Sequence, residues 1–258
     1  MRFLKYFSVF FIICCLTYCS NRTKKIDPIQ IVISADYKPF SYRVKAPDEP
    51  EGERFTGFEI DLIKEVMKRL NKAYVIEELA FDEIFCAIEG RRADIAISSI
   101  TQTPDRKERF DFTLPYFHSP QSIVLSVDNE KTTLDDLNPK KVLIQKSSSY
   151  PTILRQLLEK YPKALIVEVK DINKILEEFN KNFDKGVVIL MDRFAVKSLF
   201  DNNTYLKIKT INFQDEDLNF AIMLPKGSNL RTPINKILKE LEEDGTIKML
   251  KKKYNLVR

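Results

Sequence analysis

The sequence has no tryptophan and only one histidine in 258 residues, and three of its four cysteines lie within the first twenty positions. His118 has neither a second histidine nor a cysteine at metal-ligand spacing, which argues against a zinc site. Only Cys86 lies beyond the first segment, so removal of that segment leaves no partner for an intramolecular disulfide. Cys86 follows Phe85 in an apolar, helix-like stretch without a basic neighbour. We therefore expect a small core residue there and not a nucleophile.

The chain also lacks an apolar run long enough to cross a bilayer. The stretch Tyr6 to Leu16 has eleven residues, which at 1.5 Å each cover about half of a ~30 Å hydrocarbon core. It follows a short basic start that contains Arg2 and Lys5. This layout is typical of a secretory signal peptide, which we expect over residues 1–18.

A polar stretch follows this apolar segment. Leu16-Thr17-Tyr18-Cys19, followed by residues 20–25, resembles a bacterial lipoprotein box, although a small residue is usual where Tyr18 stands. The resemblance implies that Cys19 carries a lipid and becomes the first residue of the mature protein. A periplasmic protein anchored to a membrane through this lipid is the expectation, and a soluble exported protein is the alternative.

Charge of one sign is not in large excess. The chain has 42 Lys+Arg against 37 Asp+Glu, for a net charge of +5, of which Arg2 and Lys5 supply two. The remaining basic residues are interleaved with acids, as in residues 106–109, which indicates a solvated face and not a nucleic-acid partner. With 44% hydrophobic and 31% charged residues, the composition excludes a disordered chain, a disulfide scaffold and a multi-span membrane protein. The length allows one large domain or two lobes of roughly 100 residues.

From Ile29 onward, short apolar strands alternate with amphipathic helices. The first series predicts strands over 29–34, 73–79 and 93–99, and helices over 58–70 and 82–89, with Asp82 as the N-cap and Gly90 as the C-cap of the second helix. The second series, past Pro120, predicts strands over 123–127, 141–145, 165–169, 187–191, 205–211 and 220–224. Its helices are expected over 151–159, 171–179, 193–200 and 229–243, the last resuming through residue 254. Such alternation implies mainly parallel sheets with helices on both faces.

Five strings of residues occur in a distinctive order. They are Ala35-Asp36-Tyr37-Lys38-Pro39-Phe40, Gly57-Phe58-Glu59-Ile60-Asp61-Leu62, Phe81-Asp82-Glu83-Ile84, residues 94–106 (DIAISSITQTPDR) and Phe110-Asp111-Phe112-Thr113-Leu114-Pro115-Tyr116. Behind an export signal, and in this order, they resemble the family-3 extracellular solute-binding proteins, the polar amino-acid-binding proteins of bacterial ABC importers. The resemblance runs from about Ile29 to Tyr254.

This resemblance implies an α/β, two-lobed periplasmic-binding-protein fold of type II, in which the lobes close on a ligand. Each lobe would have a mainly parallel sheet flanked by helices, and the chain would cross between lobes twice, near residues 118–120 and 213–217. Lobe one would comprise residues 27–117 and 218–258, and lobe two residues 118–217.

Two charged residues match the family's binding positions for a free amino acid. An α-carboxylate calls for a charged, two-pronged donor, which arginine supplies and lysine does not. Arg106 matches the family's carboxylate-binding arginine, and Asp192 matches its ammonium-binding aspartate, although Asp192 also suits a helix N-cap.

Ser148 and Ser149 match a hydroxyl pair whose amides reach the carboxylate at a helix N-terminus. The family usually has glycine just before this pair, where the chain has Ser147.

The resemblance implies further ligand contacts on lobe one. Ser98, Ser99 and Thr101 follow a strand end, where ligands of open α/β sheets gather, and would offer backbone and hydroxyl groups to the ammonium and carboxylate. Tyr37 and Phe81 match two aromatic residues that sandwich the ligand side chain, with plain core packing as the alternative.

We therefore expect a binding protein, without a cofactor or metal, that delivers a polar L-amino acid to an ABC permease and its ATPase. The ligand would be of the glutamine, arginine/lysine or cystine class, and the protein a monomer with no nucleic-acid partner. Relatives that bind cationic amino acids or glutamine often carry an acid three residues before the pocket aromatic, where this chain has Ser34. Asp36 immediately precedes Tyr37 in the sequence, so its side chain can point away from the pocket.

Two alternatives remain open. An enzyme on the same fold, similar to cyclohexadienyl dehydratase, would need an acid/base group over its substrate, and His118 is poorly placed for that role. A sensing domain of a receptor or of a wall-cleaving lyase would need a further domain, for which a chain ending at Arg258 leaves no room.

Overall fold

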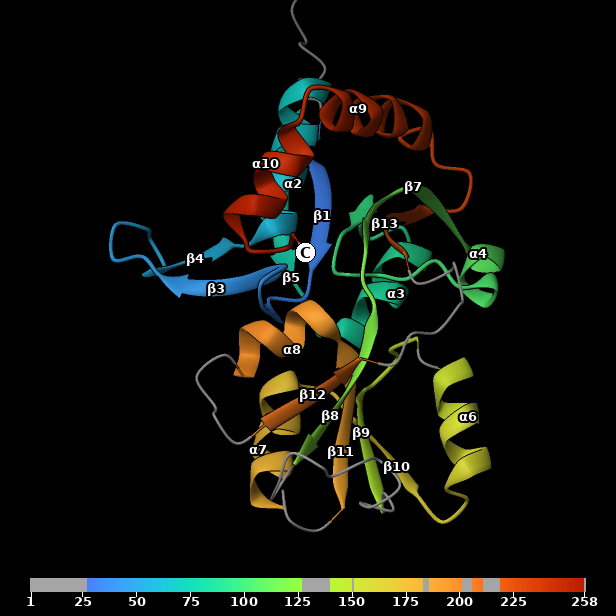
Figure 1. Ribbon diagram of the computed structural model, residues 1–258. Helices are drawn as coiled ribbons and strands as arrows, with labels where there is room; N and C mark the ends of the chain where they lie inside the picture. Colours follow the sequence, from blue (N-terminus) through green and yellow to red (C-terminus); the bar gives the residue numbers. More distant parts are fainter. Residues whose placement is uncertain are drawn as a thin grey trace, which may run out of the picture.

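The computed structural model describes residues 27–126, 140–149, 151–182, 186–200, 206–210 and 219–257. Figure 1 shows two lobes, each built on one five-stranded sheet with helices around it. The predicted signal peptide, the proposed lipid attachment at Cys19 and the predicted second crossing at residues 213–217 lie outside the described residues.

The first sheet has the strand order β5-β1-β6-β13-β7. Its strands are β1 (Ile29–Ile33), β5 (Tyr74–Glu78), β6 (Ile95–Ala96), β7 (Phe110–His118) and β13 (Asn219–Pro225). β1 pairs in parallel with β5 and β6, whereas β13 pairs antiparallel with β6 and β7. Four strands therefore run in one direction and β13 runs against them. Its helices are α2 (Phe58–Leu70), α3 (Phe81–Glu89), α4 (Pro104–Arg109), α9 (Arg231–Glu243) and α10 (Thr246–Lys253).

The second sheet repeats this plan in the order β10-β9-β11-β8-β12. Its strands are β8 (Gln121–Ser126), β9 (Lys141–Gln145), β10 (Leu165–Val169), β11 (Val187–Asp192) and β12 (Leu206–Thr210). β9 pairs in parallel with β10 and β11, and β8 pairs antiparallel with β11 and β12. The helices of this lobe are α6 (Pro151–Lys160), α7 (Ile172–Lys181) and α8 (Arg193–Phe200).

Helices cover both faces of each sheet because alternate strand residues point to opposite sides. In the first lobe, Ile31 packs in a cluster with α2 and α9, while its neighbour Val32 packs in a cluster with α3. In the second, Ile189 packs with α7 and α8, while Val188 packs with α6. Every residue of β11 is buried, as expected for a central strand with both faces covered.

A third, three-stranded antiparallel sheet was not anticipated from the sequence. It contains β2 (Asp36–Tyr37), β3 (Ser41–Lys45) and β4 (Glu53–Thr56) and extends from the first lobe in Figure 1. Gly57 joins it to α2 with φ of +126°, and a Cβ there would lie 2.1 Å from the carbonyl oxygen of Phe40. Only glycine allows this approach, which places the start of α2 against β2 and β3.

Two local predictions are wrong, and a third is correct only in part. Helix α3 begins at Phe81 with Ala80 as its N-cap, and the Asp82 side chain makes no cap; it accepts a hydrogen bond from Lys146 Nζ at 2.8 Å. Cys86 is exposed and does not lie in the core, because the buried face of α3 is formed by its neighbours Ile84, Ala87 and Ile88. The third predicted strand is shorter than expected and spans only Ile95–Ala96.

The chain passes from the first sheet to the second between β7 and β8, through Ser119 and Pro120. Among the described residues, no helix is both long enough and apolar enough to span a bilayer.

Candidate functional site

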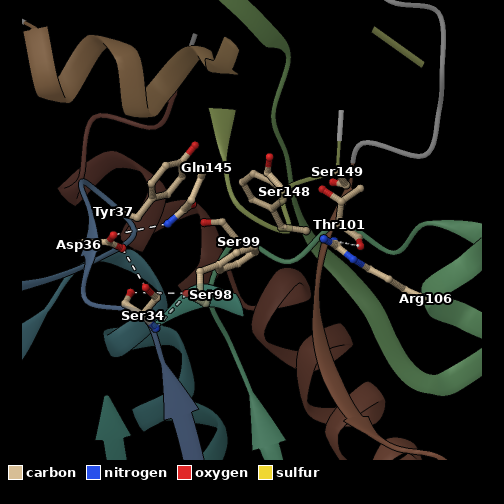
Figure 2. A pocket seen from close by; sticks show the side chains of 12 residues that line it. Ser34, Asp36, Tyr37, Ser98, Ser99, Thr101, Arg106, Gln145, Ser148 and Ser149 are labelled. Carbon is tan, nitrogen blue, oxygen red and sulfur yellow. Dashed lines mark hydrogen bonds between the residues drawn. The ribbon is translucent and has the colours of Figure 1, made fainter. Parts of the chain in front are cut away.

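Polar residues at the ends of strands from both lobes surround one pocket. Ser34 follows β1, Ser98 and Ser99 follow β6, and Gln145 ends β9. The pocket encloses a cavity of about 30 Å³ and is shown in Figure 2. Its lining residues are Ser34, Asp36, Tyr37, Phe81, Ser98, Ser99, Thr101, Arg106, Gln145, Ser148, Ser149 and Phe220.

The structure brings eight of the nine sequence-predicted ligand residues to this pocket, and only Asp192 is not part of its lining. Four lining residues were not predicted: Ser34, Asp36, Gln145 and Phe220. Ser34 and Gln145 lie at carboxyl ends of strands, as Ser98 does, so their positions in the sequence carried a usable signal.

Arg106 lies on α4 and bridges the two lobes. Thr103 caps this short helix, since its Oγ1 accepts from the Arg106 amide at 3.4 Å. The Arg106 guanidinium lies 4.8 Å from the Phe85 ring centroid and donates to the carbonyl oxygen of Thr101 at 2.7 Å. A second donation, also at 2.7 Å, reaches the carbonyl oxygen of Ser147 in the other lobe. The Phe85 ring and the two carbonyl oxygens fix the orientation of the guanidinium at the pocket wall.

A buried carboxylate holds the turn after β6. Glu59 of α2 is fully buried, and its Oε1 accepts from the Ser99 amide at 2.6 Å and from the Ser99 hydroxyl at 3.0 Å. Ser41 and Tyr116 donate to the same carboxylate, which burial drives toward a raised pKa against the effect of these donors. Ser99 adopts φ of +49°, and the hydrogen bonds to Glu59 offset the energetic cost of this left-handed conformation. Ser98 accepts from the Ser34 amide at 3.0 Å and ties the turn to β1.

The turn between β9 and α6 supplies the hydroxyls of the second lobe. Ser147 has φ of +62°, the left-handed conformation that glycine adopts most readily, which is in keeping with the glycine expected at this position. The Ser148 amide donates to the carbonyl oxygen of Gln145 at 3.0 Å. The Ser148 Oγ is buried and has no hydrogen-bond partner among the described residues.

Asp192 lies behind the pocket and is joined to it by Tyr37. Its Oδ1 accepts from the amides of Phe194 and Ala195, each at 3.0 Å, which makes it a cap of α8, and from the Ser119 hydroxyl at 2.9 Å. The Tyr37 hydroxyl, from the other lobe, donates to Oδ2. Burial raises the pKa of Asp192, and these four donors act against that rise.

The two predicted aromatic residues both line the pocket and both pack in a core. Tyr37 stacks on Phe40, with ring centroids 6.0 Å apart. Phe81 is 8% exposed and meets Phe85 edge-to-face at 5.5 Å. Each of these two side chains therefore both lines the pocket and packs in a hydrophobic core.

Asp36 lines the pocket and does not point away from it. Its Oδ1 accepts from the Ser34 hydroxyl at 2.9 Å, which turns the side chain back toward β1. The sequence could not reveal this orientation, because the other contacts of the carboxylate come from Gln145 and Ile172 in the second lobe.

A two-lobed fold with hydroxyls and an arginine in a pocket between the lobes agrees with the family suggested by the sequence strings. The family model for bacterial extracellular solute-binding proteins, family 3, matches residues 29–257. The chain belongs to this family. It is accordingly a binding protein of the extracellular side and not an enzyme, and its fold is the type II periplasmic-binding-protein fold.

Named relatives of this family-3 binding protein have similar length. The arginine-binding extracellular protein ArtP of Bacillus subtilis is 29% identical over 86% of this chain and 83% of its own. The L-cystine-binding protein TcyJ of Escherichia coli is 26% identical over 91% and 85%. A solved arginine-transport periplasmic binding protein of Legionella pneumophila superposes with a TM-score of 0.73 at 28% identity, over 88% of this chain and 99% of the other.

Proposed function

We propose that this protein captures a free polar L-amino acid between its lobes and delivers it to the permease and ATPase of an ABC importer. Lobe one would comprise residues 27–117 and 218–258, and lobe two residues 118–217, with the protein acting as a monomer. The observation that carries the proposal is the pocket between the two sheets, in which an oriented guanidinium lies beside hydroxyls from both lobes.

Arg106 binds the α-carboxylate in this proposal. Its planar fork matches a carboxylate, and the carbonyl oxygens of Thr101 and Ser147, which accept from it, are neutral groups that a carboxylate outcompetes as a charged partner. Thr101 and Ser149 lie at the same end of the pocket (Figure 2). The Ser148 Oγ, buried without a partner among the described residues, gains one from a ligand oxygen there.

Asp192 and Ser98 receive the α-ammonium. The Tyr37 hydroxyl occupies Asp192 Oδ2 and must give way to the ammonium, which offers a stronger, charged hydrogen bond. Tyr37 then lies beside the ligand side chain, with Phe81 as the other wall. Ser99, held by Glu59, supports the floor of the site.

The named relatives support an amino acid as the ligand, since ArtP is named for arginine and TcyJ for L-cystine. We accordingly propose a ligand of the arginine/lysine, glutamine or cystine class. A thermal-shift panel of the common L-amino acids and cystine against the purified protein tests this. A ligand at 100 times its Kd stabilises the folded state by about 2.7 kcal/mol, a shift that is easily detected. If no member of the panel raises the melting temperature, the proposed function is wrong.

We also propose that Cys19 is lipidated and anchors the protein to a membrane. The mature protein should then partition into detergent, and Cys19→Ala should release it into the aqueous phase. Intact-mass spectrometry decides the matter, because a mature N-terminus without acyl mass contradicts lipidation and leaves a free exported binder.

A further inference from the structure

The Asp36 carboxylate is a partly buried acid at the pocket, and two of its three hydrogen bonds to other residues are long. Besides the Ser34 hydroxyl at 2.9 Å, its Oδ2 meets Gln145 Nε2 and the Ile172 amide at 3.4 Å each, which are long for hydrogen bonds. Ser34 and Gln145 are buried beside it, which limits the access of water to this end of the pocket. The carboxylate therefore has spare capacity as an acceptor on the side that faces the cavity.

An ionised Asp36 has no cationic partner in the part of the chain that the structure describes. No lysine, arginine or histidine there forms an ion pair with it, and the nearby Asp171 adds a second negative charge. Burial raises its pKa, with the Asp171 charge acting in the same direction. An ionised carboxylate in such a place is costly unless a cation accompanies it. The Ser34 hydroxyl and the amide at the start of α7 favour the ionised form.

The pocket has opposite charges at its two ends. Among the described lining residues, Asp36 is the carboxylate and Arg106 the cation, and Figure 2 shows them on opposite sides with Ser98, Ser99 and Ser148 between them. An α-ammonium is separated from its carboxylate by one carbon atom. With the α-carboxylate at Arg106, the far end of the pocket is thus within reach of a long side chain and out of reach of the α-ammonium.

We propose that Asp36 binds a cationic group at the end of the ligand side chain, so that the protein selects a basic L-amino acid of the arginine or lysine type. This inference rests on the proposed function, because it requires an amino acid with its α-carboxylate at Arg106. Gln145 complements Asp36, since its amide oxygen can accept a second hydrogen bond from a guanidinium or ammonium. Acidic amino acids are excluded by charge, and neutral amides lack the charge that compensates Asp36.

Calorimetric titration of arginine and citrulline into the wild-type protein and Asp36→Asn isolates this contact. Citrulline has the length and shape of arginine but carries a neutral ureido group. We expect the wild-type protein to bind arginine at least about tenfold more tightly than citrulline, as a charged hydrogen bond predicts. In Asp36→Asn that preference should fall to within about threefold, mainly through weaker arginine binding. Lysine and its neutral analogue norleucine provide the same comparison for a shorter cation.

Asp48→Asn is the matched control, because Asp48 is an exposed acid of the same lobe outside the pocket, and it should retain the wild-type preference. Equal wild-type affinity for arginine and citrulline, with the same result for lysine and norleucine, would overturn the inference while leaving an amino-acid binder. So would an equal loss of both ligands in Asp36→Asn. Should Asp36→Asn not fold, the wild-type ratios decide alone. Absence of binding by every amino acid would reject the proposed function as well.

Discussion

At the scale of single residues, the pocket is held by side chains that bond to backbone groups. Arg106 donates to the carbonyl oxygens of Thr101 and Ser147, and Glu59 accepts from the amide of Ser99. Such bonds fix the donors of the site before a ligand enters, which reduces the entropy lost on binding.

Replacing Arg106 by lysine should weaken amino-acid binding at least about tenfold without unfolding the protein. Lysine keeps the charge but loses the two-pronged donor, while the cap of α4 by Thr103 is unaffected. Calorimetric titration with the ligand found in the thermal-shift panel measures the change. Arg109→Lys, whose parent residue pairs with Glu89 on the surface, is the control and should bind normally. Unchanged affinity in folded Arg106→Lys would show that another residue holds the carboxylate.

Phe81→Leu should reduce ligand affinity several-fold and cost about 1 kcal/mol of stability. Leucine refills much of the core space but removes the flat ring from the pocket wall. Phe112→Leu is a matched control, because Phe112 is buried in the same cluster and does not line the pocket. Chemical denaturation and titration on both variants separate the roles, and equal affinities in the two would leave Phe81 as a core residue only.

At the scale of elements, the strands of the two main sheets were the most predictable part of the fold. The largely buried β9 and the partly exposed edge strand β10 both match their predicted bounds, because short apolar runs between turns are typical of strands. β2, β3 and β4 were missed, since they are short and Ser41–Lys45 has Val44 as its one aliphatic residue on a largely exposed sheet. α4 has six residues and none is buried, so it leaves no apolar period, although Thr103 followed by Pro104 is a helix-start signal.

The orientation of side chains across the lobes was not predictable in the same way. Besides their local contacts, Asp36 and Tyr37 form hydrogen bonds with residues more than a hundred positions away, such as Gln145 and Asp192. Local sequence carries no information on those partners. Family resemblance predicted Arg106 as a ligand residue, and the structure places it in the pocket lining, whereas composition alone would have left it among the surface charges.

The β9–α6 turn allows a stability test. Ser147 has φ of +62°, which costs a residue other than glycine roughly 1–2 kcal/mol. Ser147→Gly should therefore stabilise the protein by about 1 kcal/mol, after the larger chain entropy of unfolded glycine is subtracted. Its carbonyl oxygen, which accepts from Arg106, remains, so ligand affinity should hold. A denaturation midpoint that does not rise would mean that the serine side chain contributes an offsetting contact.

At the scale of the whole molecule, the two lobes meet through polar contacts around the pocket. Asp82 at the start of α3 pairs with Lys146 at 2.8 Å and lies 3.7 Å from Lys170, both in the second lobe. The Lys146 hydrogen bond lowers the pKa of Asp82, so the pair is ionised at neutral pH. These contacts join the two lobes, so a separation of the lobes would break them.

Asp82→Asn should weaken ligand binding by about two- to fivefold, mostly through faster dissociation, because it removes the ion pairs of Asp82 with Lys146 and Lys170 that join the lobes. The difference from the wild-type protein should shrink in 1 M salt, which screens exposed charges. Stopped-flow dissociation at low and high salt measures both effects. Glu89→Gln, which breaks the Arg109 pair within one lobe, should have no such effect. A salt-independent loss would argue against a role of this pair in closure.

A crystal structure of the protein with the amino acid that gives the largest thermal shift tests the central claim most directly. The account predicts the ligand between the two sheets, with its α-carboxylate on the Arg106 guanidinium, its ammonium on Asp192 in place of the Tyr37 hydroxyl, and its side chain extended toward Asp36. A ligand bound outside this pocket, or one that leaves Arg106 on the Thr101 and Ser147 carbonyls and Tyr37 on Asp192, would contradict it.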